Sequence, residues 1–418
     1  MRITPKMIEG AAVMTAELLK FAQPADAALS AYFRAQKSGS RDRAFIAETA
    51  YAVLRRRRWL TKVAGEKANP GQLALAALVR VQGVNMRQLE EALDHDEQAW
   101  VKELKARPEP ELTLAEQADF PDWLAERLSV RLDAAELLQL ARSLNQPAPL
   151  DLRVNEFKAK REEVMAQLAA EGMAGEPCRY APQGIRLRSK PALSRHPLYL
   201  EGKIEVQDEG SQLLGYLLAP KRGEMVVDFC AGAGGKTLLL GALMRSTGRL
   251  YAFDVSDKRL AKLKPRVARS GLSNVHPACI SGENDQRVKR LAGKIDRVLV
   301  DAPCSGLGTL RRNPDLKWRQ TPESISELTR KQADILASAS RLVKPGGRLV
   351  YATCSILAEE NENIVDAFLA AHPQFHRLSA SELLAKQGIA LDCGGDLRLL
   401  PQTHDTDGFY AAALERDK

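Results

Sequence analysis

The amino-acid sequence predicts an α/β protein, in which a doubly wound, mostly parallel sheet follows a small α+β module and an all-helical region. Three observations support this prediction. Strand-like and helix-like segments alternate regularly from residue 205 onward, short strands flank one amphipathic helix between residues 141 and 204, and residues 1–140 show helical periodicity. A chain of 418 residues exceeds one ordinary domain and fits two or three.

The helical region, residues 1–140, contains one segment with an unusual charge pattern. Apolar side chains recur at helical spacing over residues 42–60, and the opposite face ends in Arg55, Arg56, Arg57 and Arg58. Cations at the end of a helix are favoured by the helix dipole, so this run can be a solvated helix end. The same cations could instead contact RNA phosphates. Both interpretations stay open, and the four arginines are candidate RNA-binding residues.

The small α+β module, residues 141–204, begins where the composition changes at the sequence SLNQPAP (residues 143–149). A short strand at residues 150–154 precedes an amphipathic helix at residues 158–172, and two more short strands follow. This order predicts a few strands packed on helices.

The C-terminal part, residues 205–418, alternates strands with helices, which predicts βαβ units and a mostly parallel sheet. A last strand at residues 408–414 is expected to run antiparallel. The predicted strands are 225–229, 250–254, 275–280, 295–300 and 347–353, and the predicted helices are 236–244, 257–270, 322–343 and 360–371.

Composition narrows the function classes. Lys and Arg number 61 against 53 Asp and Glu, a net charge of +8 that fits a nucleic-acid partner without proving one. No run approaches 18 apolar residues, so no membrane span is expected. The first residues carry Glu9 and Glu17 and lack an apolar core, so we expect no secretory signal and a cytoplasmic protein. The sequence is silent on oligomeric state, and a monomer is the simplest expectation.

Cysteine and histidine usage gives no sign of a disulfide framework or a metal site. Six cysteines in 418 residues are more typical of core positions or reactive thiols. The six histidines show neither HExxH nor CxxC spacing, so no metal is expected.

A glycine-rich loop follows the first strand of the predicted sheet, and Asp254 ends the second strand. Glycines let the backbone approach a ligand closely, and an acid after the second strand can bind a ribose hydroxyl pair. A Walker A loop needs glycine where Cys230 stands, and a dinucleotide fingerprint needs a third glycine where Thr237 stands. S-adenosylmethionine therefore fits best. The loop consists of Cys230, Ala231, Gly232, Ala233, Gly234, Gly235 and Lys236.

Two cysteines stand at equivalent strand ends. Cys304 follows Asp301 after the fourth strand, and Cys354 follows the fifth. Ligands in a doubly wound sheet bind beyond the carboxyl ends of the strands, so both thiols should face the cofactor. A single cysteine is more often a buried core thiol. Two at matched positions favour a function.

The chemistry of cytosine gives such thiols a purpose. Carbon 5 is a poor nucleophile, but a thiolate adding to carbon 6 makes an enamine that can attack a sulfonium methyl group. An acid is needed at the ring nitrogen, where Asp301 would stand, and a base must remove the carbon 5 proton before release.

Four motifs resemble the RsmB/NOP family of RNA 5-methylcytosine methyltransferases. They are VQDEGSQLL (206–214), CAGAGGKT (230–237), DAPCSGLGTLRRNPDLKW (301–318) and ATCS (352–355), and the resemblance spans about residues 143–415. It implies a Rossmann-like class I methyltransferase domain that uses S-adenosylmethionine, preceded by an RRM-like module. TDGFY (406–410) is similar to the family's ending. SRDRAFIAETAYAVLRRR (40–57) is similar to the NusB-like RNA-binding domain of bacterial RsmB, and FPDWLAERL (120–128) to the bridge that follows it. This layout implies 16S ribosomal RNA as the substrate.

The resemblance also implies residue roles. Cys354 corresponds to the family's nucleophile and Cys304 to the cysteine that assists release. The family's cofactor contacts correspond to the loop from Cys230 to Lys236 and to Asp254, Asp285 and Asp301. Two departures stand out. The usual loop CAAPGGK reads CAGAGGK here, which predicts a less rigid loop, and the usual GDGR reads ENDQR at residues 283–287.

Basic residues beside the DAPC loop complete the predicted RNA site. Arg311, Arg312 and Lys317 could hold phosphates, whereas Trp318 is expected to pack in the core rather than stack on a base. The target base must leave any helix it occupies. Two alternatives remain: the same chemistry on transfer RNA, and a non-catalytic, NusB-like assembly factor.

Overall fold

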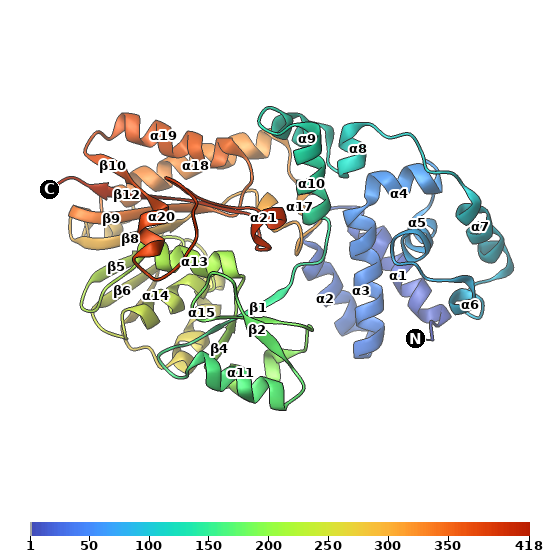
Figure 1. Ribbon diagram of the computed structural model, residues 1–418, viewed down its shortest axis with the longest axis horizontal. Coiled ribbons are helices and arrows are strands. Elements are labelled where there is room, and N and C mark those ends of the chain that lie inside the picture. Colours follow the sequence, from blue (N-terminus) through green and yellow to red (C-terminus); the bar gives the residue numbers. More distant parts are fainter. Residues whose placement is uncertain (1) are drawn as a thin grey trace. The chain divides into compact units, whose positions relative to one another are not determined.

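The computed structural model describes residues 2–418, which form two compact units. One unit contains residues 2–147 together with residues 309–322, and the other contains residues 148–308 and 323–418. The first is helical and the second holds both sheets (Figure 1). The predicted fold class is thereby confirmed. No helix among residues 2–418 combines the length and the apolar character needed to cross a membrane.

The helical unit is built on α1, which packs against α3 and α5. Met7, Met14 and Leu54 are among its most deeply buried side chains. A π-helical turn, Ala77–Val81, extends α5. The helices are α1 (Pro5–Leu18), α2 (Ala25–Gln36), α3 (Ser40–Arg55), α4 (Arg57–Ala64), α5 (Pro70–Ala76), α6 (Met86–Leu89), α7 (His95–Ala106), α8 (Leu114–Ala118), α9 (Asp122–Ser129), α10 (Ala134–Leu144) and α17 (Leu316–Arg319).

The helical spacing noted over residues 42–60 belongs to two helices, because the chain breaks between α3 and α4 at Arg56. The buried Asp119 accepts a hydrogen bond from the Trp59 backbone N–H at 3.1 Å and pairs with Arg56 at 3.1 Å. An acceptor at a helix N-terminus satisfies one of its unpaired N–H groups. Because Asp119 lies 60 residues away in sequence, local periodicity could not reveal this break.

The small module carries an antiparallel sheet of order β2-β3-β1-β4. Val164 and Leu168 of α11 pack on the inward side chains of this sheet. The elements are β1 (Leu150–Val154), α11 (Arg161–Ala170), β2 (Gly175–Pro177), β3 (Gly184–Leu187), α12 (Pro197–Leu200) and β4 (Ile204–Val206).

The larger sheet has the order β10-β12-β9-β8-β5-β6-β7, with β11 paired to β12. Strands β5 to β9 pair in parallel, and β12 runs antiparallel to β9, as the sequence predicts. The strands are β5 (Met225–Asp228), β6 (Arg249–Asp254), β7 (Val275–Cys279), β8 (Ile295–Asp301), β9 (Val343–Thr353), β10 (Phe375–Leu378), β11 (Leu397–Leu399) and β12 (Phe409–Arg416).

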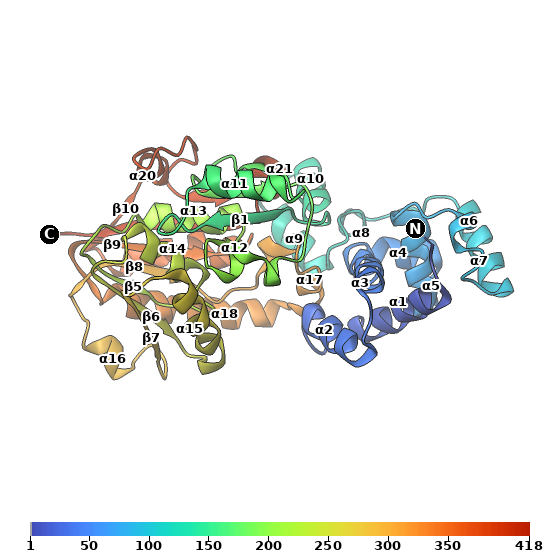
Figure 2. The same ribbon diagram turned by 90° about the horizontal axis from the view of Figure 1, so that it is seen from below.

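Helices cover both faces of this sheet (Figures 1 and 2). Alternate residues of one strand point to opposite faces, so Val226 faces the core shared with α13, α14 and α15, whereas Val227 faces the core shared with α18 and α19. The helices are α13 (Glu209–Leu218), α14 (Gly235–Leu243), α15 (Asp257–Ser270), α16 (Gln286–Lys289), α18 (Pro322–Ser340), α19 (Glu362–Ala371), α20 (Ala380–Ala385) and α21 (Pro401–His404).

Candidate active site

The glycine-rich loop, residues 230–235, joins β5 to α14 at the carboxyl end of the sheet. Gly232 and Gly234 have φ values of +56° and +87°, which side chains rarely adopt. A Cβ atom on Gly234 would also lie 2.0 Å from Leu263 Cδ1. The Ala231 N–H donates to Phe253 O at 2.8 Å. The loop therefore lies tightly against β6 and α15.

Asp254 stands beside this loop at the end of β6, with only 3% of its surface exposed. One carboxylate oxygen accepts the Gly232 N–H and the other accepts the Ser256 N–H, both at 2.8 Å. Arg259 also pairs with one of these oxygens at 3.4 Å. A carboxylate has about four lone-pair sites, so the two backbone donors and this ion pair still leave capacity for a ribose hydroxyl. The acceptor oxygens of Asp254, together with the backbone of the glycine-rich loop, thus fit a nucleoside cofactor.

The departure from the usual loop sequence has a structural counterpart at Ala233. Arg266 of α15 donates to Ala233 O at 2.6 Å, and its guanidinium is held in turn by Glu205 at 2.7 Å. This side-chain bond fixes the backbone where a proline would otherwise restrict it. The predicted loss of rigidity is therefore offset by tertiary contacts.

Lys236 lies at the start of α14, where its ammonium donates to Asp301 Oδ2 at 2.7 Å. Burial alone would lower the pKa of Lys236, but the charge of Asp301 outweighs it and raises that pKa above its usual value. Nearby, Thr237 donates to Asp228 at 2.7 Å, and burial raises the pKa of Asp228 to about 7. A fixed cation thus stands between the cofactor loop and the DAPC loop.

The two predicted cysteines come together. Cys304 follows β8 and Cys354 follows β9, and these strands pair in parallel. Their Sγ atoms lie 3.4 Å apart, and both side chains are partly buried. The hydrogen bond with Cys354, and then burial, raise the pKa of Cys304 well above its usual value. One thiol of the pair is therefore held protonated beside the other.

A buried carboxylate that sequence reasoning missed joins the two cysteine loops. Glu360 Oε1 accepts the Ser305 N–H at 2.8 Å and Gln332 Nε2 at 3.0 Å. Its other oxygen accepts the hydroxyls of Ser305 and Ser355. Each serine follows one of the cysteines, so Glu360 ties Cys304 and Cys354 to one anchor. No local feature of the sequence marks Glu360 as buried beneath both loops.

The chain ending also braces this site. The Gly308 N–H donates to Cys354 O, and the Gly408 N–H donates to Gly308 O, both at 2.8 Å. A Cβ atom on Gly308 would lie 2.2 Å from Gly408 O. The TDGFY motif therefore supports the DAPC loop through a close backbone approach that requires glycine.

The hydrogen bonds of Asp285 join it to its neighbours in sequence. It is partly exposed and accepts the backbone N–H groups of Ser281 and Arg287 at 2.9 and 2.8 Å, which caps α16. Those backbone hydrogen bonds lower the pKa of Asp285. Its role toward a cofactor stays a prediction.

The predicted phosphate contact at Lys317 is wrong, because this side chain is fully buried in the helical unit. Its ammonium donates to Arg55 O at 2.9 Å and to Asn145 Oδ1 at 2.8 Å. Burial lowers the pKa of Lys317 to about 7. Trp318 packs in the core, as expected, and donates to Leu54 O at 2.8 Å.

The other predicted RNA contacts are also engaged within the helical unit. Arg55 donates to Arg311 O at 3.2 Å, Arg56 pairs with Asp119, and Arg58 pairs with Asp122 at 2.6 Å. Arg57 lies over the Trp318 ring at 5.1 Å. Arg311 is 7% exposed and Arg312 half-buried. Many of these arginines therefore make contacts within the protein.

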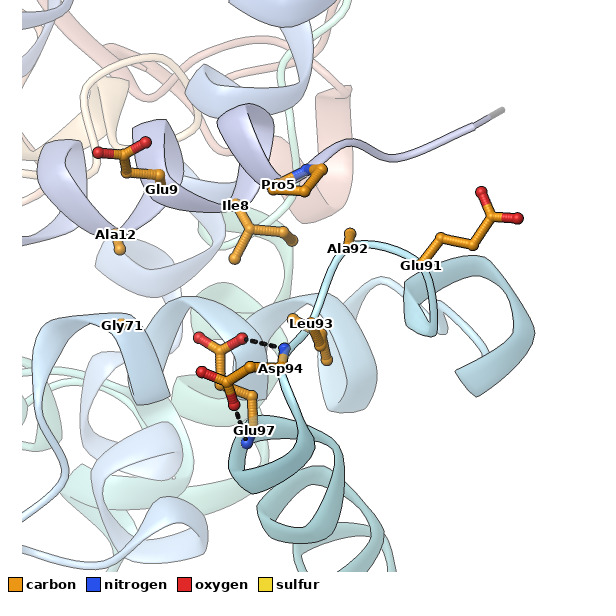
Figure 3. Close-up of a pocket in the computed structure, with 10 residues that line it drawn as sticks. All are labelled: Pro5, Ile8, Glu9, Ala12, Gly71, Glu91, Ala92, Leu93, Asp94 and Glu97. Carbon is orange, nitrogen blue, oxygen red and sulfur yellow. Dashed lines mark hydrogen bonds between the residues drawn. The ribbon is translucent and has the colours of Figure 1, made fainter.

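A cavity of about 590 Å³ in the helical unit is lined by acids (Figure 3). Asp94 and Glu97 exchange hydrogen bonds with each other's backbone N–H, which forms a capping box at the start of α7. Glu91 pairs with Arg2 at 2.9 Å. Negative charge repels RNA phosphates, so this cavity is not a phosphate site.

Three potential metal ligands, Asp151, Cys178 and Glu209, lie within 4.8 Å of one another in the small module and α13. Arg186 already supplies a positive charge there, with its guanidinium 2.7 Å from Asp151 and 3.6 Å from Glu209. The chemistry of this cluster is that of a buried ion pair.

Comparisons with known proteins give family matches in two parts of the chain. Residues 215–415 match the family described as "16S rRNA methyltransferase RsmB/F", and residues 120–194 match its ferredoxin-like domain. A probable ribosomal RNA small subunit methyltransferase B of Synechocystis is 40% identical over 308 residues, covering 73% of this chain and 68% of the relative. The chain belongs to the RsmB/F family.

Other relatives agree. A probable ribosomal RNA small subunit methyltransferase B of Bacillus subtilis is 33% identical over 76% of this RsmB/F chain and 70% of its own length. The crystal structure of PH0851 matches the whole of both chains with a TM-score of 0.80 and 29% identity. The predicted membership is confirmed. The RsmB/F protein is an rRNA methyltransferase with S-adenosylmethionine as methyl donor.

Proposed function

We propose that this enzyme methylates carbon 5 of a cytosine in small-subunit ribosomal RNA through a covalent adduct between Cys354 and carbon 6. The observation that carries this proposal is the 3.4 Å separation of the Cys304 and Cys354 sulfurs at the ends of neighbouring parallel strands. Methyl transfer to an amino nitrogen needs no such thiol. The RNA would be modified in the cytoplasm.

Cys354 is the nucleophile in this proposal. Its thiolate adds to carbon 6, which places an electron pair on carbon 5. The ammonium of Lys236 lies close enough that Cys354 is among the charges raising its pKa, after Asp301. When bound, S-adenosylmethionine supplies the electrophilic methyl group that carbon 5 receives.

Cys304 acts at release. Its raised pKa keeps it protonated beside Cys354, so it does not compete as the nucleophile. After methylation the carbon 5 proton must leave, and cleavage of the sulfur–carbon 6 bond then restores the aromatic ring and frees Cys354. Once the Cys354 sulfur is bonded to carbon 6, the hydrogen bond that raises the pKa of Cys304 is lost, so Cys304 can give its proton to solvent and then accept the carbon 5 proton as a base.

Asp301 and Lys236 provide the proton that the adduct needs at nitrogen 3 of the cytosine. Addition of a thiolate at carbon 6 builds negative charge on the ring, and a proton delivered to nitrogen 3 neutralises it. The pair shares a hydrogen bond of 2.7 Å, through which the Lys236 ammonium can supply the proton that Asp301 passes to nitrogen 3. The proton returns when the adduct breaks down.

The two cysteines have different expected phenotypes. Cys354→Ala should abolish methylation while cofactor affinity stays within about twofold, because removing a covalent nucleophile leaves binding intact. Cys304→Ala should accumulate an RNA–protein adduct that survives a denaturing gel. Cys279→Ala, at the carboxyl end of β7, is the matched control and should stay active. Near-normal turnover of Cys354→Ala would refute the proposal.

The substrate is tested by bisulfite mapping of 16S ribosomal RNA and transfer RNA from cells with and without the gene. A 5-methylcytosine lost from 16S RNA supports the proposal, and one lost only from transfer RNA supports the alternative. Family membership already favours an enzyme over a non-catalytic assembly factor.

A further inference from the structure

One helix of the sheet-containing unit, α15, is strongly basic. Helix α15 carries a single acid, Asp257, among fourteen residues. A basic stripe along a helix is the electrostatic footprint of a nucleic-acid partner. Its cations are Lys258, Arg259, Lys262, Lys264, Arg266 and Arg269.

A cavity of about 580 Å³ opens between α15 and the small module. Its apolar wall includes Leu150, Leu193 and the half-exposed Val206, and its basic wall contains Lys262, Arg266 and Arg269. This volume falls in the range of about 300–1,000 Å³ typical of small-molecule sites. One side of the cavity suits a base and the other an anion.

The basic wall is held in a fixed geometry by a buried acid. Glu205 is 4% exposed and pairs with Arg266 and Arg269, each at 2.7 Å. The Arg269 guanidinium lies over the Tyr199 ring at 4.2 Å. One carboxylate offsets two guanidiniums, and Lys262 is exposed in addition. The wall therefore keeps a net positive charge on side chains that are already ordered.

This wall is joined to the cofactor loop. Arg266 donates to Ala233 O at 2.6 Å, and Ala233 itself lines the cavity. Neither Cys304 nor Cys354 is among the lining residues, so a ligand here is not the base undergoing reaction. The cavity is thus a neighbouring site on the same unit.

We propose that this cavity binds a nucleotide of the substrate RNA other than the target cytosine. The apolar wall takes the base, and Lys262 and Arg266 take the phosphate. The choice of RNA rests on charge complementarity and on the family's rRNA substrate, and thus on the proposed function. Single-stranded RNA is the form that can splay a base into such a site.

The first test compares two lysines of the same helix. Lys262 lines the cavity and Lys264 does not, although both are exposed. With a fluorescein-labelled single-stranded fragment of 16S RNA, Lys262→Glu should weaken binding about tenfold at 0.1 M salt and lower the salt slope by about 0.7, the value for one phosphate on a single strand. Lys264→Glu should change the Kd less than about twofold. Equal effects of the two variants, or none, would overturn the proposal.

A second measurement locates the contact. Fragments carrying 4-thiouridine are cross-linked to the full-length protein by light, and the attached peptides are identified by mass spectrometry. Attachment at Tyr199 or within residues 262–269 supports the site, and attachment confined to other segments contradicts it. If poly-glutamate displaces the labelled RNA as well as unlabelled RNA does, the cavity belongs to an acidic protein segment instead.

This test can fail separately from the proposed function. Lys262→Glu should raise the KM for RNA with little change in kcat, because Lys262 does not touch the reacting atoms. RNA binding does not need the thiol of Cys354, so an active Cys354→Ala variant would remove the proposed chemistry and leave the cavity result standing. Unchanged RNA binding by Lys262→Glu, together with a trapped adduct in Cys304→Ala, would remove the cavity proposal and leave the proposed chemistry standing.

Discussion

Two buried charges, Lys317 in the helical unit and Glu360 in the sheet-containing unit, tie distant segments together by different means. Both side chains are 0% exposed. Glu360 accepts hydrogen bonds at both oxygens from Ser305, Ser355 and Gln332. Lys317 donates to Arg55 O and Asn145 Oδ1, and the positive charges of Arg55 and Arg56 oppose it.

The different surroundings of Glu360 and Lys317 indicate different roles for the two side chains. A buried ion is costly unless hydrogen bonds and opposite charge compensate it. Glu360 is held by donors from both cysteine loops, so it fixes reactive groups. Lys317 lies among arginines, and burial lowers its pKa to about 7 despite the attraction of Asp119. It fixes residues 309–322 in the helical unit, where no predicted nucleophile lies.

The largest effect is expected at Glu360. Glu360→Ala frees both serines, and a misplacement of about 1 Å can cost about 100-fold in rate. We expect single-turnover methylation to fall by about that factor while the affinity for S-adenosylmethionine stays unchanged. Glu360→Gln keeps an acceptor oxygen and should recover part of the rate.

The control for Glu360 is thermal stability measured in parallel with the reaction of the two thiols. Diamide should join Cys304 to Cys354 readily in the parent protein, because their sulfurs are 3.4 Å apart, and more slowly in Glu360→Ala. An unchanged oxidation rate, with methylation lost only in proportion to stability, would make Glu360 a purely structural residue.

Lys317 should affect stability rather than chemistry. Lys317→Ala leaves a cavity and unpaired acceptors at Arg55 O and Asn145, which should cost about 2–4 kcal/mol. All four tryptophans of the sequence lie in the helical unit, so their fluorescence in urea reports on that unit. The kcat of the folded variant should match the parent, and a kcat loss comparable to that of Glu360→Ala would break the comparison.

The pH dependence of the helical unit should follow Lys317. The pKa of Lys317 is lowered from 10.5 to about 7 in the folded chain, so the unfolded chain binds one more proton between these values. The free energy of unfolding should therefore rise as the pH increases from about 7 toward 10. Lys317→Met should flatten this rise in urea midpoints at pH 7, 8 and 9. An equal rise in both proteins would assign it to other groups.

The smallest effect is expected at Arg58. Its guanidinium already pairs with Asp122 at 2.6 Å and donates to Phe120 O at 2.8 Å. Arg58→Ala should leave the salt slope of RNA binding unchanged within error. A slope lowered by about 0.7 would show that Arg58 contacts a phosphate despite these bonds, and would restore the RNA-binding interpretation of the arginine run.

Much of the fold was accessible from periodicity. The alternation of strands and helices predicted the parallel sheet, the strand β1 was placed at its observed bounds, and the antiparallel last strand was expected. The ends of helices and strands were harder to predict from the sequence where tertiary contacts determine them. Strand β9 begins at Val343 rather than at residue 347, because its start pairs with Ile295 of β8.

The candidate site likewise contains residues that the sequence predicted and residues that it did not. Cys304 and Cys354 were predicted to meet because carboxyl ends of neighbouring parallel strands lie at one edge of a sheet. Glu360 was missed because nothing local marks it as buried beneath both loops. Lys317 was assigned to RNA because a lysine in a basic run is usually solvated, and only packing shows that it is enclosed.

The sequence by itself determined the fold class, the family and the residue types at the strand ends, because these depend on periodicity and on motifs read along one chain. Only the tertiary structure decided which charges reach solvent, since burial depends on side chains contributed from far away in sequence. Asp119, Asn145 and Glu205 each enclose or order a cation that the sequence leaves open.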